Sequence, residues 1–559
     1  MNTRFPDQTL IPFQTRQLAH ATLAYVQPGL PSIDWLGQYA YLIASELEQD
    51  SDFTSEHRTF FAERYGGTGI SVNGGGARCG TDGRFQVKGI GRNQLAGERA
   101  DFWHSHGGFT LSHALTEVIW GEVLQRALPH GATRCPALIL TGTQCWIKGP
   151  KGSKQTTARA LAVRDNALRP AHFERAVLFR AAPGSELGSD TERVRSAVNQ
   201  LPEFLPMPAE TSSATWQALD HTTRLHAGLA EMVKRFAQQA AAAKAKRLMH
   251  GTLTSSNLAL DGRWLDYGTV AALPSYANTK SYGLPPPVPT LWQEHFALLT
   301  VIDNLSFSVS KYYREEPAAL PRATVLKRLF EQHYLAALRT GFVELAGFPQ
   351  DLLAPHHAHP ACIQLADALI AAARRGVEKP FAPNVANLDV YGTNPLSRWL
   401  PALACRCAII SEIPAAIVAA YDAVSQLIMG EATPAWRTLC ALNAMRQARN
   451  MPQLYRQNII DRCDHLSAGS AGPAIQQWVE ECSDDAEMVY RSSTGLRSLI
   501  WQRGSEQVEF DAGSGRWLMR SSDTDITFAF FHQLPCATAI RQYWGSTLDR
   551  ILAIATTRH

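Results

Sequence analysis

The chain has 559 residues, a formal net charge of +3 at pH 7 and 45% hydrophobic residues. This length and composition are typical of a globular protein with more than one structural unit, and they exclude an intrinsically disordered chain. The nearly neutral charge gives no basis for binding nucleic acid or an anionic membrane surface. Membrane insertion is not expected either, because no apolar run approaches the roughly 20 residues that a membrane helix needs.

The N-terminal sequence MNTRFPDQTLIPF lacks the apolar core of a signal peptide. The ten cysteines are scattered and form no C-x-x-C pair, which disfavours a zinc site and favours free thiols in a reducing compartment. We therefore expect a cytoplasmic protein. Residues 1–60 mix short apolar and polar runs and are predicted to be an N-terminal extension with a few helices.

Two glycine-rich clusters open the next region. YGGTG at residues 65–69 is followed by NGGGARCG at 73–80 and by RFQVKGIG at 84–91. Glycine clusters before a β-type run predict a glycine-rich hairpin followed by a strand that carries Lys88.

A helix and two strands are expected after this hairpin. Residues 110–128 have helical periodicity, and Glu117 interrupts an otherwise largely apolar face. Residues 137–147 and 158–164 are predicted to be strands, joined by the basic loop 148–157.

The second half of the chain is mostly helical in pattern. A polar and acidic stretch, residues 183–213, is expected to connect two lobes or to form an inserted loop. Residues 215–249 and 291–312 have long helical patterns, and further helical runs extend to about residue 450. Residues 486–534 return to strand-and-turn character and predict a small C-terminal α+β unit.

The most informative segment is HGTLTSSN at residues 250–257, followed by LDYG at 265–268. Asn257 and Asp266 are nine positions apart. An Asn on a short loop and an Asp on a short hairpin can hold one divalent metal between them, and kinase-fold enzymes hold Mg²⁺-nucleotide in this way.

In this order, the motifs resemble the SelO family, also called YdiU, over roughly residues 65–310. The shared features are the glycine-rich turn, the K-G-x-G strand end, a Glu-bearing helix, ARALAVRDNALRPAHFE at 158–174, HGTLTSSN and LDYG. The resemblance implies an α+β, two-lobed, protein-kinase-like fold with a helical C-terminal extension and a small C-terminal α+β appendage. It also implies transfer of AMP from ATP to proteins, with Mg²⁺ or Mn²⁺. The expected divisions are an N-terminal extension (1–60), an N-lobe (61–183), a mostly helical C-lobe (184–450) and a C-terminal appendage (451–559).

The resemblance assigns roles to individual residues. Lys88 matches the strand lysine that contacts nucleotide phosphates, and Glu117 matches its ion-pair partner on the helix. Asn257 and Asp266 match the metal ligands, and Asp266 also belongs to the nucleotide site. The remaining matches are all phosphate-contacting groups, from the glycine-rich loop, a second glycine and an arginine pair: Gly74, Gly76, Arg78, Gly107, Arg164 and Arg169.

One position departs from the family in a chemically important way. The family usually has Asp immediately before the metal-binding Asn, whereas this chain has Ser256. A base contributes on the order of 10²–10⁴ in rate when a hydroxyl is the nucleophile, and serine cannot serve as that base at neutral pH. His250, or a histidine within 104–106, is an alternative base. A carboxylate nucleophile needs none, so the acceptor is expected to be either a protein hydroxyl or the C-terminal carboxylate of a peptide.

The carboxylate acceptor fits a specialised branch of such proteins. The chain resembles microcin-maturation proteins of the MchC/MceJ type, which act with an acyltransferase-like protein partner on a peptide C-terminus. The alternative hypothesis is a nucleotide-binding pseudoenzyme that supports a partner enzyme without chemistry of its own. A phosphotransferase is disfavoured, because the family binds its nucleotide in the inverted orientation.

Overall fold

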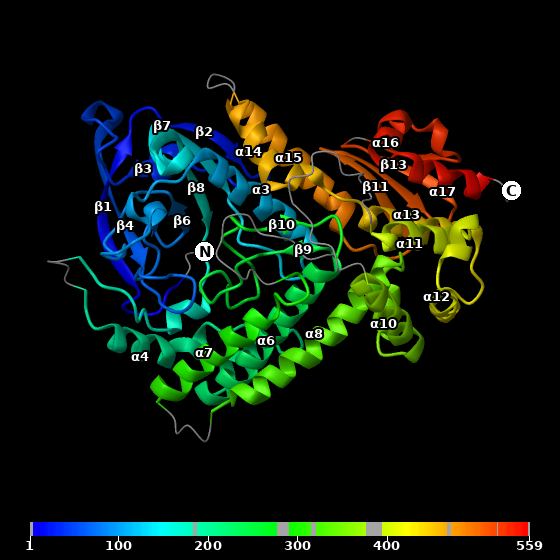
Figure 1. Ribbon diagram of the computed structural model, residues 1–559, viewed down its shortest axis with the longest axis horizontal. Coiled ribbons are helices and arrows are strands. Elements are labelled where there is room, and N and C mark those ends of the chain that lie inside the picture. The colour runs from blue at the N-terminus through cyan, green and yellow to red at the C-terminus, as the bar shows by residue number, and fades with distance from the viewer. Residues whose placement is uncertain are drawn as a thin grey trace.

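The computed structural model describes residues 4–182, 187–276, 290–314, 320–375, 394–466, 471–522 and 524–556. Figure 1 shows three parts: an N-terminal sheet, a central group of helices, and a C-terminal sheet with its own helices. This mixture of helices and strands confirms the predicted α+β class.

The N-terminal part is built around one antiparallel sheet with the strand order β2-β7-β8-β6-β5-β4-β1-β3. Its eight strands are β1 (Leu10–Leu18), β2 (Thr22–Val26), β3 (Tyr41–Leu42), β4 (Phe53–Glu63), β5 (Cys79–Thr81), β6 (Phe85–Lys88), β7 (Ala137–Lys148) and β8 (Lys154–Asp165). β7 and β8 confirm the two strands expected at 137–147 and 158–164, although their ladder extends further into the basic hairpin. β6 lies inside the sheet, between β5 and β8, so Lys88 at its end is buried.

The expectation of helices in residues 1–60 is wrong. Within the described part of this stretch, only α1 (Trp35–Tyr39) and the 3₁₀ turn Asp50–Asp52 are helical. β1 and β4 pair along most of their length. This pairing between distant segments stabilises the two strands, although their exposed polar residues do not show a clear strand pattern in the sequence. β4 also runs past residue 60, so the sheet continues across the expected boundary.

Helix α3 (Leu111–Ala127) confirms the helix expected at residues 110–128. The side chain of Thr110 caps it by accepting a hydrogen bond from the backbone N–H of His113 at 3.2 Å. α3 packs on β8 on one side and on α15 (Ala471–Tyr490) on another, so it is buried nearly all round. Glu117 and Glu122 therefore lie in the protein interior.

The central helices are α4 (Asp190–Gln200), α5 (Ser213–Ala218), α6 (His221–Ala245), α7 (Phe296–Tyr312) and α8 (Ala323–Leu345). The single helix expected at 215–249 is two, because Asp220 accepts from the Thr223 N–H at 2.9 Å and starts α6 afresh. Strands β9 (Leu248–Met249) and β10 (Ala271–Ala272) pair with each other. Residues 250–270 thus form one closed loop after α6, and this loop carries the HGTLTSSN and LDYG motifs.

The C-terminal sheet has the order β11-β12-β13-β14 and confirms the strand-and-turn prediction. Its strands are β11 (Arg497–Arg503), β12 (Glu506–Asp511), β13 (Arg516–Arg520) and β14 (Asp525–Phe528). The accompanying helices are α9 (Gln350–Leu353), α10 (Pro360–Arg375), α11 (Pro395–Cys405), α12 (Ala415–Met429), α13 (Pro434–Ala448), α14 (Arg456–Asp464), α16 (Ala537–Trp544) and α17 (Ser546–Thr556).

Helix α15 connects this C-terminal part to the N-terminal sheet. The Gln476 side chain accepts from the Val26 N–H at 2.9 Å and donates to the Val26 carbonyl at 3.1 Å. α15 therefore buttresses both β2 and α3, which carries Glu117. Among the described residues, no helix combines the length and apolar character that crossing a bilayer requires.

Candidate active site

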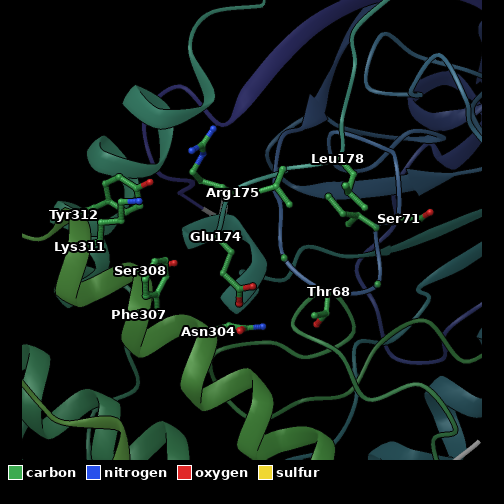
Figure 2. Close-up of a pocket in the computed structure, with 14 residues that line it drawn as sticks. Thr68, Ser71, Glu174, Arg175, Leu178, Asn304, Phe307, Ser308, Lys311 and Tyr312 are labelled. Atoms are coloured by element: carbon green, nitrogen blue, oxygen red, sulfur yellow. The ribbon is translucent and has the colours of Figure 1, made fainter.

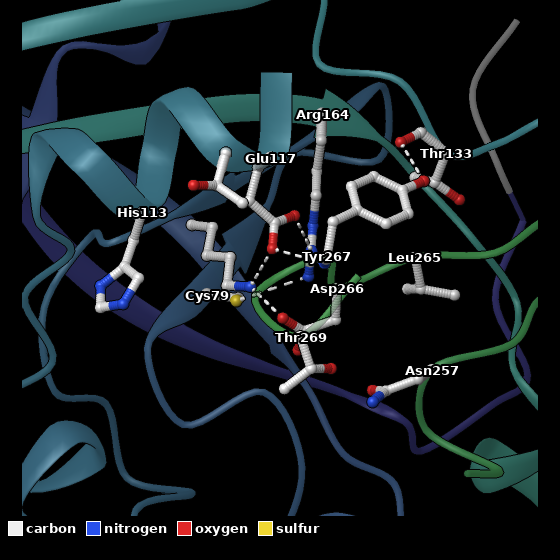
Figure 3. A network of polar contacts seen from close by, with 12 residues as sticks. Cys79, His113, Glu117, Thr133, Arg164, Asn257, Leu265, Asp266, Tyr267 and Thr269 are labelled. Carbon is white, nitrogen blue, oxygen red and sulfur yellow. Dashed lines mark hydrogen bonds and ion pairs between the residues drawn. The ribbon is translucent and has the colours of Figure 1, made fainter. Parts of the chain in front are cut away.

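One lysine and two carboxylates from separate elements meet below the N-terminal sheet. Lys88 Nζ lies 2.9 Å from Glu117 Oε1 on α3 and 2.6 Å from Asp266 Oδ1 in the LDYG turn. Figure 3 shows Glu117, Arg164 and Asp266 converging on this point. The structure thus brings together three of the residues that the sequence assigned to nucleotide and metal binding.

Glu117 is the structural centre of this cluster. Its Oε1 also accepts from the backbone N–H of Tyr267 at 3.0 Å, and its Oε2 lies 3.4 Å from Arg164 Nη1. The Tyr267 hydroxyl in turn donates to the carbonyl groups of Thr133 and Trp264, at 2.9 and 2.6 Å. A buried carboxylate with several donors is fixed in position, and here it fixes both the lysine and the LDYG turn.

Asp266 has a left-handed backbone conformation, with φ of +67°. This conformation costs a non-glycine residue on the order of 1 kcal/mol, so the surrounding contacts must hold it. Desolvation alone would raise the pKa of Asp266, but Lys88 and then Arg164 outweigh it and hold the pKa well below its ordinary value. The side chain is 38% exposed, so an ionised carboxylate is both stabilised and accessible.

Asn257 lies in the neighbouring loop with its side chain already oriented. Its Nδ2 donates to the Thr252 carbonyl at 2.9 Å, and its Oδ1 accepts from Ser256 Oγ at 3.2 Å. Its backbone carbonyl accepts from the Leu265 N–H at 3.2 Å, which ties the Asn257 loop directly to the LDYG turn. These bonds fix the orientation of the Asn257 amide group and the position of its loop next to the LDYG turn.

This pair fits a hard divalent cation. Carboxylate and amide oxygens are ligands that Mg²⁺ accepts, and Mg²⁺ is usually bound by one or two protein carboxylates together with substrate phosphates and water. In the part of the chain that the structure describes, no group of three or more His, Cys, Asp or Glu residues could form an all-protein cage. A metal held at Asn257 and Asp266 would thus depend on a phosphate-bearing ligand.

The glycine-rich loop contributes differently from what the sequence predicts. The N–H groups of Gly74 and Gly76, expected to approach phosphate oxygens, donate instead to the carbonyls of Leu95 and Glu63, at 2.8 and 2.9 Å. A Cβ at position 74 would overlap the Phe179 ring, so this glycine permits tight packing. These two residues shape the loop, and phosphate binding by their N–H groups would require those bonds to break.

Arg78, at the end of the same loop, places its positive charge close enough to influence Asp266. Its guanidinium group lies 5.1 Å from the Phe109 ring centroid and donates to the Gly108 carbonyl at 3.4 Å. Its charge contributes to the lowered pKa of Asp266. Gly107, with φ of +69°, packs so closely that a Cβ would overlap the backbone of Arg92, so its role is close approach between two loops.

The arginine pair is buried. Arg164 contacts Gln86 and Glu117, while Arg169 Nη1 donates to the Ser256 carbonyl at 2.8 Å and to the Tyr65 hydroxyl at 3.1 Å. Both residues are only 2% exposed. In this structure they therefore hold Glu117 and the Ser256 loop, and a direct phosphate clamp would require them to leave these partners.

His250 does not suit the role of an alternative base. It is fully buried, its Nε2 lies 3.0 Å from the Leu265 carbonyl, and its ring packs against Trp264. Burial lowers the pKa of His250 to about 4, although the bond to Leu265 opposes this shift. His106 also has a pKa of about 4, because burial and then Arg78 disfavour its charged form. Neither histidine is an effective proton acceptor near pH 7.

Ser256 occupies the place where an acid was expected. Its Oγ lies 3.0 Å from Thr254 Oγ1 and 3.2 Å from Asn257 Oδ1. The residue is nearly buried under the loop at Gly69, where a Cβ would overlap the hydroxyls of Ser256 and Thr254. This side of the site therefore presents hydroxyl groups where the family usually has a carboxylate.

Two functional candidates were missed by sequence reasoning. Glu174 closes the matched run 158–174 and accepts from Ser255 Oγ at 3.2 Å, so its place at the end of that motif was an available signal. Arg456, the first residue of α14, acts electrostatically on His113 at the start of α3. No local pattern indicates this electrostatic influence, because it depends on how α14 packs on α3.

Comparison with known proteins agrees with this geometry. Residues 70–281 match the model of the family described as protein adenylyltransferase SelO. The chain is 27% identical over 204 residues to the protein nucleotidyltransferase YdiU of Trichormus variabilis, covering 35% of this chain and 36% of that protein. It is 26% identical over 194 residues to the YdiU protein of Trichodesmium erythraeum, covering 34% and 37%.

The matched stretch spans little more than a third of each relative's length. The residues that the family model matches, 70–281, include Lys88, Glu117, Asn257 and Asp266. Residues 70–281 are therefore similar to the SelO/YdiU family.

Proposed function

We propose that this protein transfers AMP from Mg²⁺-ATP to a peptide or protein acceptor, on a two-lobed kinase-like fold. The observation that carries the proposal is the Lys88–Glu117–Asp266 cluster beside Asn257. The names of the family model and of the two relatives, protein adenylyltransferase and protein nucleotidyltransferase, support it. The eight-stranded sheet with α3 would form the N-lobe, and the region around α6 to α8 the C-lobe.

Each residue of the site would have a separate role in binding the nucleotide. Lys88 would contact the phosphates while Glu117 holds its ammonium group in place. Asp266 and Asn257 would hold Mg²⁺, which when bound supplies positive charge to the phosphate oxygens. Arg78 provides a further cation facing the same space. Mn²⁺ accepts the same oxygen ligands.

Ser256 favours a carboxylate as the acceptor. A carboxylate oxygen attacks the α-phosphorus, the bond to the β-phosphate oxygen breaks, and pyrophosphate leaves with the electron pair. The product is an acyl-adenylate, and no proton has to be removed. A hydroxyl acceptor would have to lose its proton, and neither Ser256 nor the two histidines with pKa values of about 4 is suited to take it.

The carboxylate that we propose as the acceptor is a peptide C-terminus. An acyl-adenylate formed there is a reactive intermediate, so it suits a partner of the acyltransferase class that passes the acyl group to a second nucleophile. We propose such peptide maturation in the cytoplasm as the specific role, with AMP transfer to a protein hydroxyl as the outcome that would displace it.

The two acceptors are distinguished by the stability of the AMP bond to hydroxylamine. The protein is incubated with α-labelled ATP, Mg²⁺ and candidate peptides, and neutral hydroxylamine is then added. An acyl-adenylate releases AMP and yields a hydroxamate, whereas AMP on a hydroxyl resists this treatment. Label that resists hydroxylamine would contradict the carboxylate proposal and leave AMP transfer intact.

A scaffold without chemistry is the second candidate function. The burial of Arg164 and Arg169 favours it, because two expected phosphate-binding groups are engaged with protein. In that case ATP binds with a measurable affinity, yet neither α-label nor γ-label is transferred to any acceptor.

A further inference from the structure

A cavity of about 540 Å³ opens on the other side of the Ser256 loop. Three segments line it: the glycine-rich residues 67–71, residues 174–178 after β8, and one face of α7 between residues 304 and 312. Figure 2 shows side chains from all three segments around this space, with the Glu174 side chain pointing toward Asn304. Its volume is within the range of pockets that bind small ligands or side chains.

Glu174 is the distinctive polar group of this cavity. The residue is only 4% exposed, and its Oε2 accepts from Ser255 Oγ at 3.2 Å. Its Oε1 is buried and has no hydrogen-bond partner within the described residues. A buried carboxylate oxygen without a partner is costly, because its desolvation is not compensated. An oxygen in this condition, in a residue that lines a cavity, points to a ligand that brings a hydrogen-bond donor.

The mouth of the cavity is apolar. Val177, Leu178 and Phe307 are 66%, 63% and 63% exposed, and they are three of the nine large hydrophobic residues that the described surface exposes. Their gathering at one opening marks a contact surface rather than scattered exposure. Two cationic side chains, Arg175 and Lys311, also line the cavity, and Arg175 Nε lies 3.8 Å from Asp190 Oδ2. The rim therefore suits an apolar group within a segment that carries negative charge.

The cavity is directly connected to the catalytic loop. The Thr68 N–H donates to Ser255 Oγ at 3.1 Å, and the same Ser255 hydroxyl donates to Glu174. A Cβ at Gly67 would overlap both Ser255 Oγ and Glu174, so the glycine lets these groups meet. Ser255 lies two residues before Asn257. A ligand in the cavity would thus lie on the acceptor side of the metal site.

We propose that this cavity is a subsite for the peptide acceptor, which inserts a bulky apolar side chain past Phe307 and donates a backbone N–H to Glu174 Oε1. The proposal rests on the proposed function, since it names the acceptor side of that same site. Burial raises the pKa of Glu174 to about 7, which the bond from Ser255 opposes, so the group accepts a hydrogen bond best at neutral and alkaline pH. Because backbone N–H donors occur in every peptide, the cavity would select among peptides by the apolar side chain that they insert.

The charges around the cavity favour a peptide over a nucleotide. A buried carboxylate in the floor repels a phosphate, whereas a neutral amide N–H is attracted to it. The exposed Lys311 ammonium group attracts acidic residues that flank the inserted side chain, which would add to binding at low ionic strength. The subsite is therefore expected to select an apolar residue in an acidic peptide context.

The test uses two amino-acid amides as probes on the full chain. Saturation transfer from protein to ligand is measured by NMR for N-acetyl-phenylalaninamide and N-acetyl-alaninamide, and ATP affinity is measured separately by calorimetry. The variants are Phe307→Asp and Glu174→Gln. Phe296→Asp is the matched control, because Phe296 is also exposed on α7 and does not line the cavity.

The wild-type protein and Phe296→Asp are expected to show saturation of the phenylalanine probe at least threefold above that of the alanine probe. Phe307→Asp should lose this preference, and Glu174→Gln should weaken binding of both probes about fivefold. Equal binding of the phenylalanine probe by Phe307→Asp and wild type would overturn the proposal. If the wild-type protein binds the probes but does not bind ATP, the proposed function is overturned and the peptide subsite is not.

Discussion

The two sides of the candidate site are built in opposite ways. On the nucleotide side, Lys88, Glu117 and Asp266 satisfy one another at distances below 3 Å, and Tyr267 and Arg164 add further contacts. On the acceptor side, hydroxyl groups stand where an acid was expected, and the buried Glu174 carboxylate has an oxygen without a partner in the described part of the chain. In the proposed function, the nucleotide side is preorganised before its ligand binds. The acceptor side depends on a hydrogen-bond donor that the acceptor supplies to Glu174.

The largest expected effect comes from removing charge on the nucleotide side. Asp266→Asn keeps the size of the side chain but removes a metal-binding carboxylate, so AMP transfer should fall on the order of 10³-fold. The measurement is transfer from α-labelled ATP at saturating Mg²⁺. Asp261→Asn is the control, because Asp261 pairs with Arg263 at the surface of the same loop. Equal rates in Asp266→Asn and wild type would show that the metal assignment is wrong.

The next effect separates catalysis from stability on a single helix. Glu117 and Glu122 are both buried in α3, but Glu122 pairs with Arg126 and Arg134 away from Lys88. Because each substitution breaks a buried ion pair, Glu117→Gln and Glu122→Gln should each lower the free energy of unfolding by about 3–5 kcal/mol.

Only Glu117→Gln should also lower AMP transfer, by about 100-fold, because it frees the Lys88 ammonium group from its position. Denaturant unfolding and the α-label assay, run on both variants, measure these two quantities. A Glu122→Gln variant that is as inactive as Glu117→Gln would mean that the loss reflects folding rather than the lysine.

A third variant restores the missing acid on the acceptor side. Ser256→Asp places a negative charge next to Asn257, and with a carboxylate acceptor it should reduce acyl-adenylate formation about tenfold by repulsion. Ser256→Asn is the neutral control of the same size. A tenfold gain in total AMP transfer in Ser256→Asp would indicate that a base had been limiting, and therefore that the acceptor is a hydroxyl.

The smallest effect concerns pH and stability at Glu174. Burial raises the folded-state pKa of this residue to about 7, from an ordinary value of 4.5. Its contribution to stability is therefore fully present below about pH 4.5 and is lost as the pH rises through about 7, by on the order of 3 kcal/mol.

Glu174→Gln should flatten the dependence of stability on pH in this range. As the pH rises from 5 to 8, the melting temperature of the variant should therefore rise by a few degrees relative to that of the wild type. Glu210→Gln, at an exposed position, is the control. Parallel pH profiles for Glu174→Gln and wild type would contradict the raised pKa.

The sequence allowed the proximity of Lys88, Glu117 and Asp266 to be predicted because local motifs carry these three residues. Lys88 ends a strand, Glu117 lies on a helix with a clear periodicity, and Asp266 follows Asn257 at a spacing that a short hairpin imposes. The ordered family motifs then indicated that these residues meet. The length and order of the elements between them were sufficient for that prediction.

Other features depend on contacts that no local pattern reveals. The strands β1 and β4 pair residues that are between 35 and 53 positions apart, from Leu18 with Phe53 to Leu10 with Glu63, and their polar residues obscure the strand pattern. The N–H groups of Gly74 and Gly76 are used within their own loop, which composition cannot indicate. The burial of His250 and the unpartnered oxygen of Glu174 likewise follow from tertiary packing.

The most direct test of the central claim is the fate of the two ends of ATP. The protein is incubated with Mg²⁺ and either α-labelled or γ-labelled ATP, in the presence of candidate peptide acceptors. The account predicts that α-label is transferred to the acceptor while γ-label is released as pyrophosphate. Transfer of γ-label to the acceptor, with ADP as the product, would contradict it.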